Sequence, residues 1–232
     1  MEALVYKTLP YMVFKWIHFI AGVTWIGVLY YFNFIQGEWF KEIEDQTKGK
    51  AVRTLVPRAL WWFRWGAMFT FLSGALMLGI HGHDGGFSYS SAYNMYIYAG
   101  ALMGTLMFLN VWLLIWPAQQ VVIASSESVA NGGEAHPEAA SCLATAGLAS
   151  RTNTLFSFPM LFFMGAARGL DSIGIAPDSS ITAAMIAITA VILLIEANGI
   201  YGKMGPITSV KGVIHCGVAL TVLLYLIICY CV

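Results

Sequence analysis

The sequence has few charged residues, and their charges cancel. Charged residues make up 10% of the 232 positions, and 12 lysines and arginines balance 12 aspartates and glutamates. A chain without an excess of basic charge lacks the electrostatic footprint of a nucleic-acid-binding protein. Apolar residues make up 59% of the chain, which is typical of a polytopic membrane protein rather than a soluble domain. We therefore expect the chain to contact the lipid bilayer and no nucleic acid.

Familiar cofactor motifs are also missing from the sequence. None of the four cysteines stands in a C-x-x-C-H motif, so the chain encodes no covalent c-type haem. There is no P-loop and no G-x-G-x-x-G motif, which argues against common nucleotide sites. The first apolar run is too long for a cleaved secretory signal and is expected to be a retained membrane span.

The apolar runs predict an all-α bundle of about six transmembrane helices in a single domain, 1–232. A helix needs about 20 apolar residues to cross a bilayer. The third span is predicted to stop at Pro117, and the fourth to begin before Arg151. The predicted spans are 11–36, 59–80, 93–116, a fourth centred on 154–167, 181–198 and 210–231.

The distribution of lysine and arginine predicts the orientation. Positive residues favour the cytoplasmic side of a membrane. The first, third and fifth loops, with the helix ends beside them, carry most of them, whereas Lys7 and Arg168 lie on the other side. We therefore expect these three loops to be cytoplasmic and both termini to be outside, in a bacterial inner membrane. The residues on the cytoplasmic side are Lys41, Lys48, Lys50, Arg53, Arg58, Arg64, Arg151, Lys203 and Lys211.

His18 stands inside the first apolar run, where an imidazole needs a partner. At helical spacing it shares a face with the small residue Gly22 and with Trp25. This pattern leaves a notch in which a flat ligand such as a haem is able to lie, with the imidazole pointing at its centre. The alternative is a histidine that hydrogen bonds to a neighbouring helix, with Gly22 as a packing contact.

Three further histidines are candidate ligands. His215, in the last span, also has small residues on the adjoining turns, and rise per residue places it at a depth similar to that of His18, ~13–17 Å from its membrane face. A bis-histidine haem b between the first and last spans is one prediction. His81 and His83, at the outer end of the second span, are the alternative haem ligands. Two other interpretations are a divalent-metal site that they form with Asp84, and histidines that are simply solvated.

Polar residues near the inner ends of the spans are candidates for binding. Arg58 and Arg64 stand among three tryptophans, and this cluster indicates either a site for an anion or a haem propionate, or a membrane-interface belt. Residues 151–154 are able to cap the fourth helix or to supply polar groups to a substrate. Glu196 is a candidate proton relay or an interface residue.

Several segments together resemble the membrane-bound urate hydroxylase family, that is, the urate oxidase N-terminal membrane domain. The resemblance is specific in its tryptophan and arginine clusters and weaker after residue 164. More distantly, the chain is similar to haem-binding membrane protoporphyrinogen oxidases, which share the histidine in the first helix. The segments that carry the resemblance are His18 to Gly27, Tyr30 to Phe34, Val56 to Ala67, Asn110 to Pro117 and Ser150 to Met164.

The resemblance implies a haem b oxidoreductase module that passes electrons from a small substrate, such as urate, to a c-type cytochrome. In the family the membrane domain is usually followed by a cytochrome c domain. The sequence ends after the sixth run, so a separate cytochrome or a larger membrane complex is expected to take the electrons. The alternatives are a non-catalytic electron-transfer or anchoring subunit, a protoporphyrinogen oxidase-like enzyme, and a transporter, although the inverted repeats of many transporters are not evident.

Overall fold

The computed structural model describes residues 2–83, 92–169 and 181–231, and within these ranges it is built of helices without a strand. This confirms the predicted all-α fold. Two of the long helices are interrupted by π-helical segments, labelled η1 and η2, without losing their course. The elements are α1 (Glu2–Tyr30), η1 (Tyr31–Gln36), α2 (Gly37–Glu42), α3 (Asp45–Thr54), α4 (Val56–His83), α5 (Ala92–Leu109), η2 (Asn110–Ile115), α6 (Trp116–Ala130), α7 (Ala139–Gly169), α8 (Ile181–Tyr201), the 3₁₀ turn η3 (Gly205–Thr208) and α9 (Val210–Cys231).

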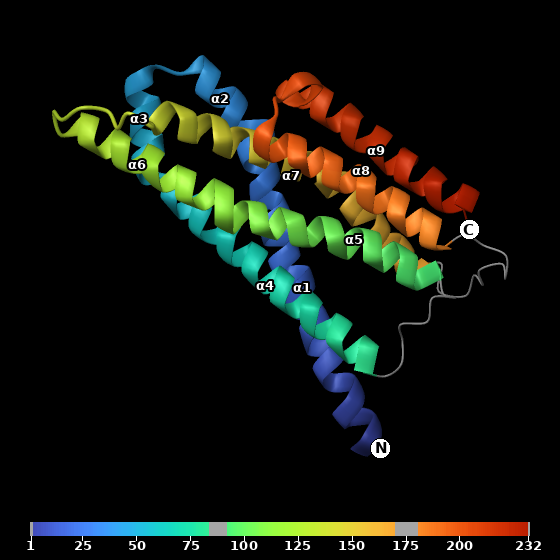
Figure 1. Cartoon of the computed structure of the whole chain (residues 1–232). Helices are drawn as coiled ribbons and strands as arrows, with labels where there is room; N and C mark the ends of the chain where they lie inside the picture. The colour runs from blue at the N-terminus through green and yellow to red at the C-terminus, as the bar shows by residue number, and fades with distance from the viewer. Residues whose placement is uncertain (1, 84–91, 170–180, 232) are drawn as a thin grey trace.

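The chain is a multi-pass membrane protein. Among the described residues, five helical stretches are long and apolar enough to cross a bilayer, and they carry the predicted spans other than the fourth. Figure 1 shows that α1 begins and α9 ends toward one end of the bundle, whereas α2, α3 and the connection from α6 to α7 lie at the other end. The five stretches are Thr8–Glu42, Val56–His83, Tyr93–Ala130, Ile181–Tyr201 and Val210–Tyr230.

The remaining long helix, α7, lies at the centre of the bundle and packs against α1, α5, α6, α8 and α9. Its middle, residues 151–157, is buried on every side. Glycines let two neighbours come close to it. A Cβ atom at Gly199 of α8 would lie 2.7 Å from the Thr152 hydroxyl, and one at Gly217 of α9 would lie 2.6 Å from the Phe158 ring. A central helix covered by protein can carry polar residues that a lipid-facing helix cannot.

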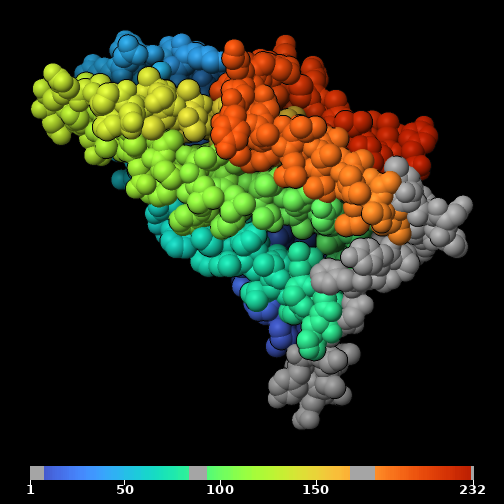
Figure 2. Space-filling model, viewed as in Figure 1, coloured from blue at the N-terminus to red at the C-terminus, as the bar shows by residue number. Residues whose placement is uncertain are grey.

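The first and second long helices form the closest pair in the bundle. A Cβ at Gly66 of α4 would lie 3.1 Å from the backbone nitrogen of Trp25, so only glycine allows this approach. In the space-filling view, α4, α5, α6 and α8 cover the face toward the viewer, and little of α1 is visible (Figure 2). The face of α1 that carries Trp25 is therefore filled by α4.

The prediction that Pro117 stops the third helix is wrong. The helix continues as α6 to Ala130. Proline lacks an N–H group and clashes with the carbonyl four residues back in a regular helix. Here the preceding turn is π-helical, with the Trp116 N–H donating to the carbonyl of Val111, five residues back. Pro117 thus stands at the first turn of a new α segment, where proline is tolerated.

Candidate functional site

The two π-helical segments carry three buried amide side chains. Asn33 and Gln36 lie in η1, and Asn110 opens η2; all three are at most 8% exposed. Both segments pack against α7. A π-helical turn re-aims side chains relative to a regular helix, and such turns are frequent at functional sites. The polar centre of the molecule therefore forms where η1 and η2 meet α7.

Asn110 connects three helices. Its Nδ2 donates to Asn153 Oδ1 of α7 at 2.9 Å and to Glu196 Oε2 of α8 at 3.2 Å. Asn153 in turn donates to the carbonyl of Met107, one turn before η2, at 2.9 Å. Glu196 is only 6% exposed and forms no ion pair within the described ranges. A buried carboxyl group held by neutral amides is equipped to hold and exchange a proton or to bind a polar ligand.

On the other side of α7, Asn33 makes the equivalent connection. Its Nδ2 donates to Ser150 Oγ at 2.8 Å and to the carbonyl of Leu29, just before η1, at 2.9 Å. One helical turn earlier, the hydroxyl of Tyr30 lies 2.9 Å from that of Ser157. At the entry to each π segment, a backbone carbonyl thus accepts an asparagine amide. The widened turn disturbs the regular ladder of hydrogen bonds there, and these amides donate to carbonyls next to the disturbed turns.

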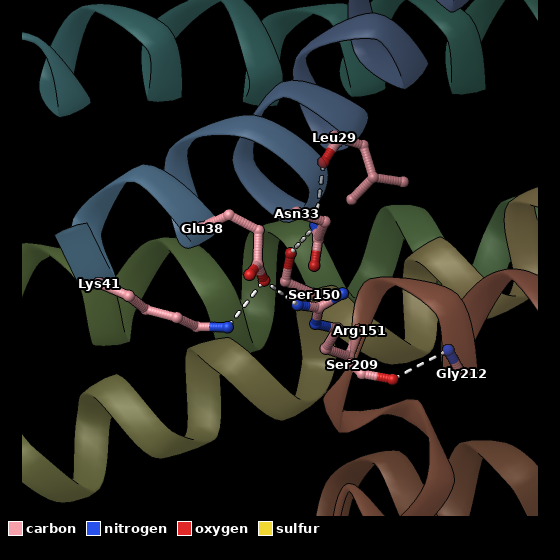
Figure 3. Close-up of polar contacts among 8 residues, drawn as sticks. All are labelled: Leu29, Asn33, Glu38, Lys41, Ser150, Arg151, Ser209 and Gly212. Carbon is pink, nitrogen blue, oxygen red and sulfur yellow. Dashed lines mark hydrogen bonds and ion pairs between the residues drawn. The ribbon is translucent and has the colours of Figure 1, made fainter.

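Next to Ser150, the side chain of Arg151 points from α7 toward α2 (Figure 3). Its Nη2 lies 4.0 Å from Glu38 Oε1, which is also 2.8 Å from Lys41 Nζ. Arg151 is 9% exposed. The sequence motif at 151–154 therefore does not cap a helix, since α7 begins at Ala139, twelve residues earlier. It supplies buried polar groups to the centre of the bundle.

His18 lies against α4, half-buried. Its Nδ1 donates to the carbonyl of Thr70 at 2.8 Å and lies 3.3 Å from the hydroxyl of Ser73. A Cβ at Gly74 would lie 3.1 Å from the ring, and one at Gly22 would lie 3.8 Å from Thr70. The face of α1 that carries Gly22 and Trp25 thus packs on α4, as in the alternative prediction of a packing contact, while Nε2 of His18 forms no hydrogen bond with a described residue.

The structure does not bring His18 and His215 together. His215 is exposed on α9, which packs on α7, α8 and η3, whereas α1 packs on α4 and α7. His81 donates through Nε2 to Asn94 Oδ1 at 3.2 Å and packs on Tyr93, and His83 is exposed. Asp84, its predicted companion at a metal site, lies outside the described residues. No group of three metal-ligating side chains occurs in the part of the chain that is described.

The cluster of arginines and tryptophans is divided in two by the structure. Arg58 and two of the tryptophans are exposed. Arg64 turns inward, where its guanidinium stacks 3.9 Å from the ring centre of Trp116 and lies 5.8 Å from that of Trp112. Arg64 Nε and Trp112 Nε1 are both buried without a hydrogen-bond partner in the described structure. Arg64, rather than Arg58, is therefore placed to donate to an anion.

An open groove of about 690 Å³ lies between α5 and α8 and includes Tyr98 and Thr189, whose hydroxyls are 2.7 Å apart. Its other lining side chains are apolar or small, with Thr182 as the remaining hydroxyl. None of the predicted site residues lines it. This surface matches lipid chains better than a polar ligand.

The analysis of the sequence did not single out Asn33, Gln36 or Asn110 as site residues. A signal was present, since a polar side chain inside an apolar run marks a functional position or a buried hydrogen bond. What the sequence did not reveal is the pair of π-helical turns that aims these amides at α7. The pattern of apolar residues alone does not distinguish such a turn from a regular one.

The Asn110–Glu196 contact generates a stability prediction. Replacing Asn110 with leucine removes the amide donor of the buried Glu196 carboxyl, and we expect the free energy of unfolding to fall by about 1–3 kcal/mol. Adding Glu196→Leu removes the unsatisfied group, so the double variant should recover part of the loss. Unfolding in mixed detergent micelles measures both. If the double variant loses as much stability as Asn110→Leu and Glu196→Leu lose in sum when made singly, the contact is not formed.

Comparison with known protein families gives one match, over part of the chain. Residues 85–195 match the family model described as "Urate oxidase N-terminal". Comparison with curated proteins and with solved structures gave no match. The matched residues include Asn110, Arg151 and Asn153, whereas His18, Asn33 and Arg64 precede them. The match agrees with the resemblance seen in the sequence, and over residues 85–195 the chain is similar to the urate oxidase N-terminal family.

Proposed function

We propose that the chain is a haem b-binding oxidoreductase module of a membrane, with His18 as one axial ligand of the haem. The observation that carries the proposal is the hydrogen bond from His18 Nδ1 to the carbonyl of Thr70, 2.8 Å long. Metal-ligating histidines almost always donate their other ring N–H to a carbonyl or carboxylate, which fixes the tautomer and the ring orientation. This bond places the hydrogen on Nδ1 and leaves the lone pair on Nε2 for iron.

The surroundings of His18 support a ligand on the Nε2 side of the ring. Gly74 lies against the ring on the α4 side, where any side chain would have to displace it. The carbonyl of Thr70 and the hydroxyl of Ser73 hold the same side. When bound, a haem supplies one-electron chemistry, and the protein sets the ligand, the orientation and the surroundings.

The small substrate of the proposed reaction is a purine such as urate, and the proposed electron acceptor is a c-type cytochrome. The family match supports this substrate class by its printed description alone. The second axial ligand stays a prediction among His215, His81 and His83. Of these, His81 has its Nε2 engaged by Asn94.

A second candidate function is a non-catalytic electron-transfer or anchoring subunit of a larger membrane complex. The observation in its favour is that the structure does not bring His215, the predicted second ligand, near His18. His215 faces outward from α9. In this alternative, a neighbouring subunit supplies the second ligand or the catalytic site.

The orientation of the chain follows from the distribution of positive charge. We place the end of the bundle with α2, α3 and η3 in the cytoplasm of a bacterium and both termini outside, because lysines and arginines gather at that end. A phosphatase reporter fused after residue 232, which folds only outside the cytoplasm, should be active. A fluorescent protein that folds only in the cytoplasm should stay dark at the same position, and the opposite pair of results would reverse the orientation.

The haem is tested by spectroscopy of the purified chain. After expression with sufficient haem, the wild type should show a Soret band and a reduced-minus-oxidised spectrum of b type. His18→Ala should lose the haem or change it from low to high spin, because it removes the iron ligand. His136→Ala, in the exposed loop between α6 and α7, is the matched control and should keep the wild-type spectrum. A wild-type protein without a Soret band would refute the proposal.

A further inference from the structure

A buried arginine with an unused donor lies at the junction of α2 and α7. Arg151 is 9% exposed, and its Nη1 is buried without a hydrogen-bond partner among the described residues. Its acidic neighbour, Glu38, is 4.0 Å from Nη2. A buried donor that loses its hydrogen bond with water and gains no other is costly, and more so when it is charged. The native fold thus leaves one donor nitrogen of the guanidinium, Nη1, without a hydrogen bond at this point.

In the ion pairs of the described residues, Arg151 and Lys41 face the same carboxylate. Glu38 is the carboxylate in contact with Arg151, and the same oxygen forms a tighter ion pair with Lys41, 2.8 Å away. Two cations therefore share one carboxylate. Figure 3 shows the guanidinium between Glu38 and Ser209 in this view, and η3, which leads into Ser209, packs on α7. An anion bound to Arg151 would balance the excess charge.

An unused acceptor belongs to the same junction. Gln36, the last residue of η1, is 8% exposed, and its Oε1 is buried without a hydrogen-bond partner in the described ranges. In the chain it stands between Asn33, which bonds to Ser150, and Glu38, which faces Arg151. Gln36 thus lies between two residues that contact consecutive positions of α7. The proposed site draws its charged donor from α7 and its amide acceptor from η1.

We propose that this junction binds a small planar anion with an acceptor for the Arg151 fork and an N–H donor for Gln36 Oε1. Guanidinium is planar and suits flat anions, which it binds through two parallel hydrogen bonds. Acidic N-heterocycles such as oxidised purines combine the two requirements in one molecule. The proposal rests on the proposed function, for which it supplies the substrate site, and it assigns Arg151 and Gln36 to substrate binding.

Urate binding to the full chain tests the site. The protein is placed in nanodiscs of phosphatidylcholine, without anionic lipid, and the Kd of urate is measured by calorimetry. Arg151→Gln should weaken binding about tenfold or more, since it removes a charged donor. Arg53→Gln is the matched control, because Arg53 is also an arginine at this end of the bundle but bonds to Ser126 of α6. It should bind urate as the wild type does.

A second variant separates the two parts of the site. Gln36→Met keeps the size of the side chain but removes the acceptor. It should weaken the binding of urate and leave the affinity for benzoate, a flat anion without an N–H group, unchanged. Arg151→Lys keeps the charge without the fork and replaces Arg151→Gln if that variant does not elute as a folded protein in gel filtration. Arg151→Lys should weaken the binding of urate and of benzoate alike.

Two results would overturn the proposal. The first is equal urate affinity in the wild type and the Arg151 variants. The second is a wild type that does not bind urate but gains heat stability from phosphatidylglycerol through Arg151, which would make the junction a lipid headgroup site. His18→Ala should still bind urate, since His18 of α1 packs against α4 and does not lie at this junction. A haem-loaded wild type without urate binding would refute this site and leave the haem proposal standing.

Discussion

The structure depends on a polar stretch at the centre of the bundle, residues 150–157 of α7, in which Ser150, Asn153 and Ser157 form hydrogen bonds with the helices around it. In a membrane, polar groups that face lipid are costly, so such a helix has to lie inside the protein. Asn33 bonds to Ser150 from one side, and Asn110 bonds to Asn153 from the other. The close approach of α8 at Gly199 completes the cover. The positions of α1, α5 and α8 thus follow from the hydrogen bonds that α7 requires.

The π-helical segments make these bonds without ending the helices that carry them. Each has a hydrogen bond from an N–H group to a carbonyl five residues back, from Gly37 to Phe32 and from Trp116 to Val111. The carbonyls of Leu29 and Met107, before the two segments, are bound by asparagine amides. The same amides that join the helices to α7 therefore also satisfy the backbone where the helices widen. Among the described residues, Arg151 and Gln36 keep an unpaired atom at the junction of α2 and α7, as Arg64 and Trp112 do elsewhere. A charged donor and an amide acceptor in the same junction are the reason for assigning these two residues a ligand.

Much of the fold was predictable, because long apolar runs determine which segments become helices in a membrane. The last span, 210–231, was predicted with the bounds that the structure has, and the fourth helix does begin before Arg151. The stop at Pro117 was wrong, since the π-helical turn that accommodates the proline has no signature in hydrophobicity. The site was less predictable. Thr70 of α4 borders the notch at Gly22, and the inward turn of Arg64 depends on Trp116 of another helix, so both depend on pairings that one sequence does not reveal.

The contact between η1 and α7 is the central claim, and cross-linking tests it most directly. In a variant with all four cysteines replaced by alanine, Asn33→Cys and Ser150→Cys put thiols at positions whose side chains are 2.8 Å apart. A short bifunctional thiol reagent applied to membranes should join this pair nearly completely. The pair Asn33→Cys and Ser141→Cys, with the second thiol on an exposed turn at the start of α7, should stay unjoined. A failure of the first pair to react, or equal reaction of both pairs, would contradict the account.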